Sequence, residues 1–289
     1  MNADHSSSAR PHAIADALRA HWPEYAIEAW ALGTFMLIAC AVATLLGHES
    51  SPVRTWLGGG IASRCVAGFA MGATAVALIT SPWGRRSGAH LNPAVTLTFA
   101  RLGRVRGIDA AFYVLAQCIG GAAGVGVAHG VLGELVAAPS VRYAITVPGP
   151  AGIGAAFLGE AIIAFTMMAM VLLTQRHERT ARFAPALAGL CVWAFITLES
   201  PLSGMSMNPA RTAASALHAG EWTAAWLYVA APLLGMALAA LAFGRRAPGC
   251  AKLMHCPRVR CIFCGREPCP SERAASHDPM LPVASRPRT

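Results

Sequence analysis

The tripeptide Asn-Pro-Ala occurs twice in this 289-residue chain, at Asn92, Pro93 and Ala94 and again at Asn208, Pro209 and Ala210. Asparagine is a favoured N-cap, because its side-chain oxygen accepts a hydrogen bond from a free backbone N–H of the first turn. Proline is tolerated in that turn, where its missing N–H would have no intrahelical partner. Each motif therefore predicts the start of a helix, with partial positive charge at its tip and an amide that can donate to a solute.

Arg211 follows the second motif directly, and Val95 takes the matching place after the first. A guanidinium is permanently charged, and in an apolar environment that charge is costly. Its presence there predicts a function, such as donating hydrogen bonds to a polar solute while repelling cations. The alternative is an arginine at a membrane surface that binds lipid phosphate.

The composition indicates that membrane helices position these motifs: 55% of the residues are hydrophobic, only 13% are charged, and the mean hydropathy is +0.49. Two apolar segments that start at the motifs, 92–101 and 208–218, are too short to cross a bilayer alone. The net charge of +9 lies in the connections and the tail, which argues against nucleic-acid binding. Six further apolar runs approach the roughly 20 residues that cross a bilayer, at 26–46, 60–80, 110–132, 153–174, 183–198 and 223–243.

The two halves of the chain carry the same pattern. Since each half holds three spans, the second copy must be inverted relative to the first. The sequence therefore predicts an all-α membrane protein, with six transmembrane helices and two re-entrant half-helices in two inverted repeats. The matching residues are Glu28, Thr34, Ser87 and Asn92 in the first half and Glu160, Thr166, Ser203 and Asn208 in the second.

The loops around the two motifs resemble the signature loops of the aquaporin (major intrinsic protein) family, at 87–96 (SGAHLNPAVT) and 203–212 (SGMSMNPART). The resemblance implies a passive channel in the lipid bilayer for water or small uncharged solutes such as glycerol or metalloid acids. It also implies exclusion of ions and protons, one pore per subunit of a homotetramer, no cofactor and no enzymatic reaction. Glu28 and Glu160 are then expected to brace the half-helix loops, with proton relay as the alternative, and His90 to brace its own loop.

The family's narrow selectivity filter is formed by four positions, and counting from the motifs without gaps gives Gly72, Ile196, Met205 and Arg211. The small Gly72 and the isoleucine at the second position resemble the nodulin-26-like branch, whose members pass metalloid acids along with some water and glycerol. Met205 is bulkier than is common in that branch and can refill the space. The alternative class is a secondary transporter with broken helices in inverted repeats, which would need coupling acids inside the membrane.

The domain organisation predicted is an N-terminal segment (1–24), a channel domain (25–244, with repeats at about 25–135 and 150–244) and a basic tail (245–289). Positive charge favours a cytoplasmic location for both termini in the plasma or inner membrane. This charge lies in the second and fourth connections, on Arg85, Arg86, Arg101, Arg104, Arg106, Arg176, Arg179 and Arg182.

The tail is polar and rich in proline, which predicts that most of it is disordered. It contains four cysteines that could bind zinc with the help of His255, although the spacings match no standard zinc finger. Reduced thiols without a metal are the alternative. The candidate ligands are Cys256, Cys261, Cys264 and Cys269, which include one C-x2-C pair.

Overall fold

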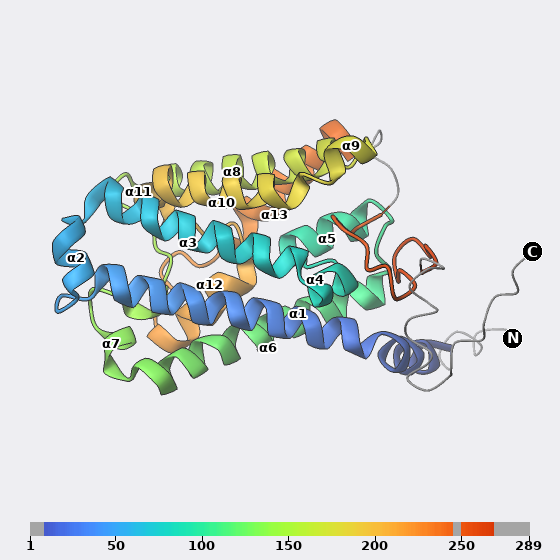
Figure 1. Ribbon diagram of the computed structural model, residues 1–289, viewed down its shortest axis with the longest axis horizontal. Coiled ribbons are helices and arrows are strands. Elements are labelled where there is room, and N and C mark those ends of the chain that lie inside the picture. The colour runs from blue at the N-terminus through green and yellow to red at the C-terminus, as the bar shows by residue number, and fades with distance from the viewer. Residues whose placement is uncertain (1–8, 245–249, 269–289) are drawn as a thin grey trace, which may run out of the picture.

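The computed structural model describes residues 9–244 and 250–268, and the regular structure in these ranges is helical throughout. The six predicted spans and the two half-helices are confirmed, with ends that agree within a few residues for every span but the first. The half-helices are α5 (Pro93–Arg101) and α12 (Pro209–Ala219). The long helices run side by side (Figure 1) as α1 (Ala9–Gly47), α3 (Gly60–Thr80), α6 (Gly107–Leu132), α8 (Gly152–Thr174), α10 (Ala184–Leu198) and α13 (Leu227–Phe243).

The long helices are apolar, and four of them reach the length of a membrane span, whereas α10 and α13 are shorter. α3, α6, α8 and the part of α1 from residue 14 onward are each long and apolar enough to cross a bilayer, which makes this an integral multi-pass membrane protein. α10 is shorter, about 22 Å at a rise of 1.5 Å per residue, but α9 (Glu178–Ala181) and α11 (Ser200–Ser203) extend its path. Exposed large apolar side chains include Phe69, Leu115, Leu158, Leu190 and Leu234.

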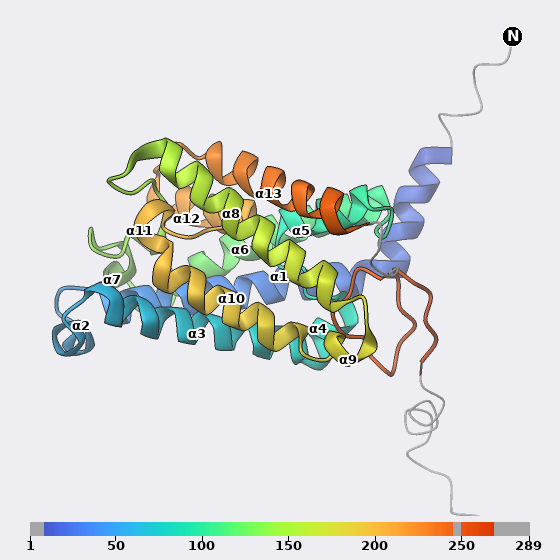
Figure 2. The ribbon, with the colours of Figure 1, turned by 90° about the horizontal axis from the view of Figure 1, so that it is seen from above.

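α1 begins well before the predicted first span and is 39 residues long. Pro23 lies inside it and cannot donate the usual backbone hydrogen bond. In Figure 2 the N-terminal part of α1 turns away from the bundle. The helix is anchored to the start of α6 on both sides of the proline, because the Tyr25 hydroxyl donates to Asp109 at 2.6 Å and His21 Nδ1 lies 2.8 Å from the same oxygen.

Small residues let the long helices approach closely in matching pairs. α1 packs against α6, α8 against α13, and α3 against α10. A Cβ added at Gly124 of α6 would collide with the backbone of Gly33 on α1, and one at Gly235 of α13 would collide with the backbone of Ala161 on α8. Such close packing drives helix association in lipid, where burying apolar surface gains nothing.

The two half-helices enter the bundle from opposite ends (Figure 1), as inverted repeats require. α5 follows the short helix α4 (Pro82–Ser87), and α12 follows α11. α4 ends at Gly88 with φ 104°, and α11 ends at Gly204 with φ 81°, both in the left-handed region that favours glycine. Three short elements complete the α12 end of the bundle: α2 (Pro52–Leu57), α7 (Glu134–Ala137) and the 3₁₀ turn η1 (Arg142–Ala144).

Residues 250–268 fold back across the end of the bundle where α4 and α9 lie (Figure 1, Figure 2). In this part of the tail, Ala251, Lys252 and Cys261 are buried. The segment is ordered because the loop before α5 offers it hydrogen-bond partners, such as His90, whose Nε2 lies 2.8 Å from Ala251 O. Residues 245–249 and 269–289 of the predicted tail lie outside the described residues.

Candidate functional site

Both Asn-Pro-Ala motifs start a helix. Asn92, Pro93 and Ala94 begin α5, and Asn208, Pro209 and Ala210 begin α12. In each motif the alanine N–H donates to the asparagine side-chain oxygen, at 2.8 Å in α5 and 3.1 Å in α12. The proline fills the first helical position, so the two helix tips have the same capped structure.

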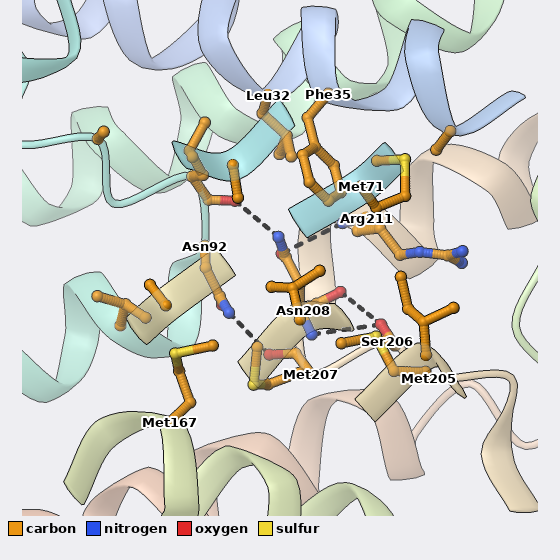
Figure 3. A pocket seen from close by; sticks show the side chains of 18 of the residues that line it. Leu32, Phe35, Met71, Asn92, Met167, Met205, Ser206, Met207, Asn208 and Arg211 are labelled. Atoms are coloured by element: carbon orange, nitrogen blue, oxygen red, sulfur yellow. Dashed lines mark hydrogen bonds between the residues drawn. The ribbon is translucent and has the colours of Figure 1, made fainter. Parts of the chain in front are cut away.

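The two tips touch each other at the centre of the bundle (Figure 3). Asn92 Nδ2 donates to the carbonyl oxygen of Met207 at 2.7 Å, and Asn208 Nδ2 donates to that of Leu91 at 2.6 Å. The exchange is reciprocal, because each asparagine binds the residue that precedes the other. It fixes both amide groups in place and directs two helix N-termini, with their partial positive charges, at one point.

Glu28 holds the loop before α5. Its two carboxylate oxygens accept from the Ser87 hydroxyl (2.8 Å), from the backbone N–H groups of His90 (3.0 Å) and Leu91 (2.8 Å), and from the Gln117 side chain (2.9 Å). The side chain is fully buried. A carboxylate with this many donors can remain in an apolar interior, and its oxygens have no position left for a relay of protons.

Glu160 does the same for the loop before α12. Its oxygens accept from the Ser203 hydroxyl (2.7 Å) and from the backbone N–H groups of Ser206 (2.7 Å) and Met207 (2.6 Å). Tyr228 completes the arrangement by donating to Ser203 O at 2.6 Å. The hydrogen bonds from Glu160 to its loop thus closely match those from Glu28 to the loop before α5, as the internal repeat predicts.

The braced loops hold an unfavourable backbone conformation. Four residues other than glycine have φ between 48° and 56° in these loops: Ala89, Leu91, Met205 and Met207. Left-handed φ values are uncommon for residues with a Cβ and persist only where surrounding contacts enforce them. They occur at matching positions in the two loops, so both repeats share this strained backbone. The hydrogen bonds to Glu28 and Glu160 help to maintain it.

His90 is buried beside its loop and uses both ring nitrogens. Nδ1 lies 3.0 Å from Thr96 Oγ1, and Nε2 lies 2.8 Å from Ala251 O. Its ring stacks on Phe99 with 5.3 Å between centroids. Ser206 stands at the corresponding place in the second loop and bonds Thr212 at 2.6 Å. His90 thus links the loop before α5 to the start of that helix and to the C-terminal segment.

A cavity of about 260 Å³ lies between the two loops and the surrounding long helices. Both asparagines line it, with the backbone of both loops on one side and apolar side chains of α1, α3, α8 and α10 on the others. The cavity is polar along one stripe and apolar elsewhere, which suits small uncharged molecules that carry hydrogen-bond acceptors. Met71, Met205 and Arg211 are among the residues that line it (Figure 3), and Ile196 lines it as well.

The assignment of Gly72 to the filter is wrong. A Cβ at Gly72 would lie 2.5 Å from Gly189 O on α10, so this position faces the α3–α10 interface and not the cavity. Met71, one residue earlier, lines the cavity instead. Counting back from Asn92 without gaps assumes a fixed length for the connection, and here α4 occupies part of it. Met71 fills the space that a glycine would have left open.

A sequence signal for this correction exists in α3. Gly68 and Gly72 are four residues apart, and a Cβ at Gly68 would lie 2.6 Å from Trp193 O on α10. A small-x-x-x-small pair marks the face on which two membrane helices approach each other. The cavity face of α3 must then be a different one, and Ala67, Met71 and Ala75 on that face line the cavity.

Arg211 brings a cationic donor into the cavity. Its backbone N–H donates to Asn208 Oδ1 at 3.3 Å, which ties the residue to the cap of α12. Its Nη1 atom is buried, and within the described part of the chain no protein acceptor bonds it. A buried donor that lacks a protein partner is available to an oxygen of a molecule in the cavity. The side chain therefore brings an unpaired donor and a positive charge to the cavity.

Among the described residues of the tail, three of the predicted zinc ligands lie together, namely His255, Cys261 and Cys264, and Cys250 joins them. The group does not include Cys256. Cys269 lies outside the described residues.

The fold and the site together define a class: a membrane protein of six spans in which two inverted half-helices meet at asparagine caps beside a cavity. The family model for the major intrinsic proteins matches residues 20–243. The chain therefore belongs to the major intrinsic protein family. Among solved structures it resembles the aquaglyceroporin from Plasmodium falciparum, with a TM-score of 0.61 and 18% identity over 76% of this chain and 94% of that one. This likeness concerns the fold alone.

Curated relatives carry aquaporin names. Aquaporin TIP4-4 of Zea mays is 39% identical over 172 residues, which cover 58% of this chain and 66% of the relative. Aquaporin NIP6-1 of Arabidopsis thaliana is 33% identical over 72% of this chain and 64% of the relative. Aquaporin A of Dictyostelium discoideum is 32% identical over 73% and 75%. The chain thus spans somewhat less than two thirds of the first two relatives.

Proposed function

We propose that the protein is a passive channel for water and small uncharged solutes, which pass through the cavity beside the two asparagine caps. The reciprocal contact of Asn92 and Asn208 is the observation that carries this proposal. It places two fixed amide groups and two helix N-termini on the wall of one cavity, where they favour neutral molecules with oxygen acceptors and disfavour cations. Members of this family are channels and not enzymes, so we infer no catalytic role.

The alternative of a secondary transporter gains no support from the family match. Coupling to an ion gradient needs an intramembrane acid that can exchange its partner. Glu28 and Glu160 are both engaged by several donors from the loops that they brace. We expect flux to be unchanged when a proton or sodium gradient is applied or collapsed, and coupled accumulation of solute would contradict the channel.

We propose Met71, Ile196, Met205 and Arg211 as the four filter residues. With Met71 in place of Gly72, three of the four walls carry bulky apolar side chains, so the opening is narrow beside Arg211. This argues for water and the smallest solutes, and it weakens the case for metalloid acids that a glycine at this position would have made.

Replacing Met71 by alanine tests both the function and the filter. We expect wild-type proteoliposomes in a stopped-flow panel of water, glycerol, urea and boric acid to conduct water best. The Met71→Ala variant should raise glycerol and boric acid permeability several-fold, because truncation removes a side chain from the cavity wall. Val66→Ala is the matched control on the same helix, since Val66 is exposed on the outer surface. Equal solute profiles for Met71→Ala and the wild type would exclude Met71 from the filter.

We further propose a homotetramer in the plasma or inner membrane with both termini in the cytoplasm. The arginines of the second and fourth connections support this orientation. Native mass spectrometry should give four chains per particle, and a protease applied from outside intact cells should leave a C-terminal tag uncut. Cleavage of the tag would place the C-terminus outside the cell and contradict the proposed orientation. We also propose a channel domain at 25–244, and the family match at residues 20–243 supports it.

A further inference from the structure

Three thiols and one imidazole of the C-terminal segment converge on one point. Their ligand atoms all lie within 4.8 Å of one another. Cys250 Sγ and Cys261 Sγ are 3.7 Å apart, and His255 Nε2 is 3.3 Å from Cys264 Sγ. The three cysteines are free thiols. The four residues are Cys250, His255, Cys261 and Cys264.

We propose that these four side chains bind one Zn²⁺ ion in a tetrahedral Cys₃His site. With Zn–S bonds of about 2.3 Å and Zn–N bonds of about 2.1 Å, a tetrahedral centre places its donors roughly 3.6 to 3.8 Å apart. The separations of 3.7 Å between Cys250 and Cys261 and 3.3 Å between His255 and Cys264 lie close to these values. The remaining donor pairs lie within 4.8 Å, so binding of the ion would draw the widest pairs together by up to about 1 Å. Three soft thiolates with an imidazole select zinc over the hard cations Mg²⁺ and Ca²⁺.

The turn that carries the last two ligands is preformed. Gly265 N donates to Cys261 O at 2.9 Å, and Cys261 N donates to Arg266 O at 3.0 Å. Gly265 follows Cys264 and has φ 70°, which a residue with a Cβ would rarely adopt. The backbone thus bends so that the C-x2-C pair presents both thiols to the same side.

The charge around the site also fits. Lys252 is 3% exposed, and among the described residues no carboxylate pairs with it. Its ammonium group lies 5.5 Å from the centre of the Phe263 ring and donates to Arg86 O. A buried cation needs a nearby negative charge. One Zn²⁺ ion with three thiolates carries a net charge of −1. The zinc site would therefore supply the negative charge that the buried Lys252 needs.

The same segment borders the cavity, so zinc bound there would influence access to it. Ala251 and Leu253 line the cavity. The Phe263 ring stacks on His90 at 5.5 Å and 9°, and Gln175 Nε2 donates to Lys252 O at 3.1 Å. The metal would tie Cys250, just before this cover (residues 251–253), to the turn around Phe263. Zinc therefore holds the cover over the proposed cytoplasmic mouth, an inference that rests on the proposed channel function.

The metal content of the full-length, reduced protein tests the site without reference to transport. We expect one zinc per chain by elemental analysis and, after exchange with Co²⁺, the visible absorption of a tetrahedral thiolate complex. Cys264→Ser should lower the zinc content at least tenfold. Cys256→Ser is the matched control, because Cys256 lies in the same segment outside the group, and it should keep its zinc. Three results would overturn the site: reduced wild type that contains no zinc, a disulfide between Cys250 and Cys261 in the isolated protein, or the same loss of zinc in Cys264→Ser and Cys256→Ser.

Water flux with chelator on both sides of proteoliposomes tests the cover. Chelated wild type and zinc-treated Cys264→Ser should both be several-fold more permeable than zinc-loaded wild type. Phe263→Ala should keep one zinc but lose the response to chelator, because the cover no longer stacks on His90. Equal flux with and without zinc in a conducting wild type would refute the cover. Absence of flux in every state would refute the channel instead, while the measured zinc content would still decide the metal site.

Discussion

Replacing Glu160 by leucine is expected to abolish water flux and to prevent stable folding. The substitution removes the acceptor of the Ser203 hydroxyl and of two backbone N–H groups, those of Ser206 and Met207. Each buried donor left without a partner costs about 1–3 kcal/mol, so the sum for the three donors is roughly 3–9 kcal/mol. This is a large part of the 5–15 kcal/mol or so that stabilises a typical folded domain. The left-handed φ values in the loop would lose their support as well.

Two variants on α8 make this prediction specific. Glu160→Gln keeps one acceptor oxygen but turns an NH₂ group toward backbone donors, so we expect partial loss of thermal stability and flux. Thr166→Val is the control, because Thr166 is exposed and its hydroxyl bonds only Ile162 O of its own helix at 2.8 Å. Melting in detergent followed by size-exclusion chromatography, together with light scattering of proteoliposomes, measures both effects. A Glu160→Leu protein that melts and conducts like the control would show that the glutamate is no brace.

The sequence predicts those parts of the molecule that short-range chemistry determines. An asparagine followed by proline has one favoured place at a helix start, and a run of about 20 apolar residues has one favoured environment. The six spans, both half-helices and their inversion therefore follow without coordinates. The glutamates were expected to act as braces only through the family resemblance. Their hydrogen bonds reach across about 60 residues from Glu28 to His90 and Leu91, which no local pattern encodes.

The errors arise where the outcome depends on rotation about a helix axis or on contacts distant in sequence. Gly72 and Met71 are adjacent, but successive residues of a helix point about 100° apart, so a shift of one residue moves a side chain from the cavity into a helix interface. The composition of the tail is that of a disordered chain, so it does not predict the folded segment at 250–268. The order of that segment depends on His90 and Gln175, which belong to distant parts of the sequence.

Removing the charge of Arg211 is expected to open the channel to cations. In Arg211→Val the second motif carries the residue that Val95 supplies after the first, so the donor and its charge disappear together. At ~5 Å and an effective dielectric constant of about 20, one positive charge repels another by roughly 3 kcal/mol, which corresponds to about a hundredfold in rate. Proton or sodium leak should rise by up to this factor, while water flux continues.

The measurement is the decay of an imposed pH or sodium gradient in proteoliposomes that contain a fluorescent indicator. Arg211→Lys should retain most of the exclusion, because the positive charge remains in the cavity. Arg142→Gln is the control for loss of a positive charge outside it: Arg142 belongs to η1, beside α12, and pairs with Glu221 at 3.3 Å at the partly exposed surface. If the proton and sodium leak of Arg211→Val is as low as that of Arg142→Gln, the prediction is wrong. The two helix N-termini alone would then provide the barrier to cations, and Arg211 would serve only as a donor to the solute.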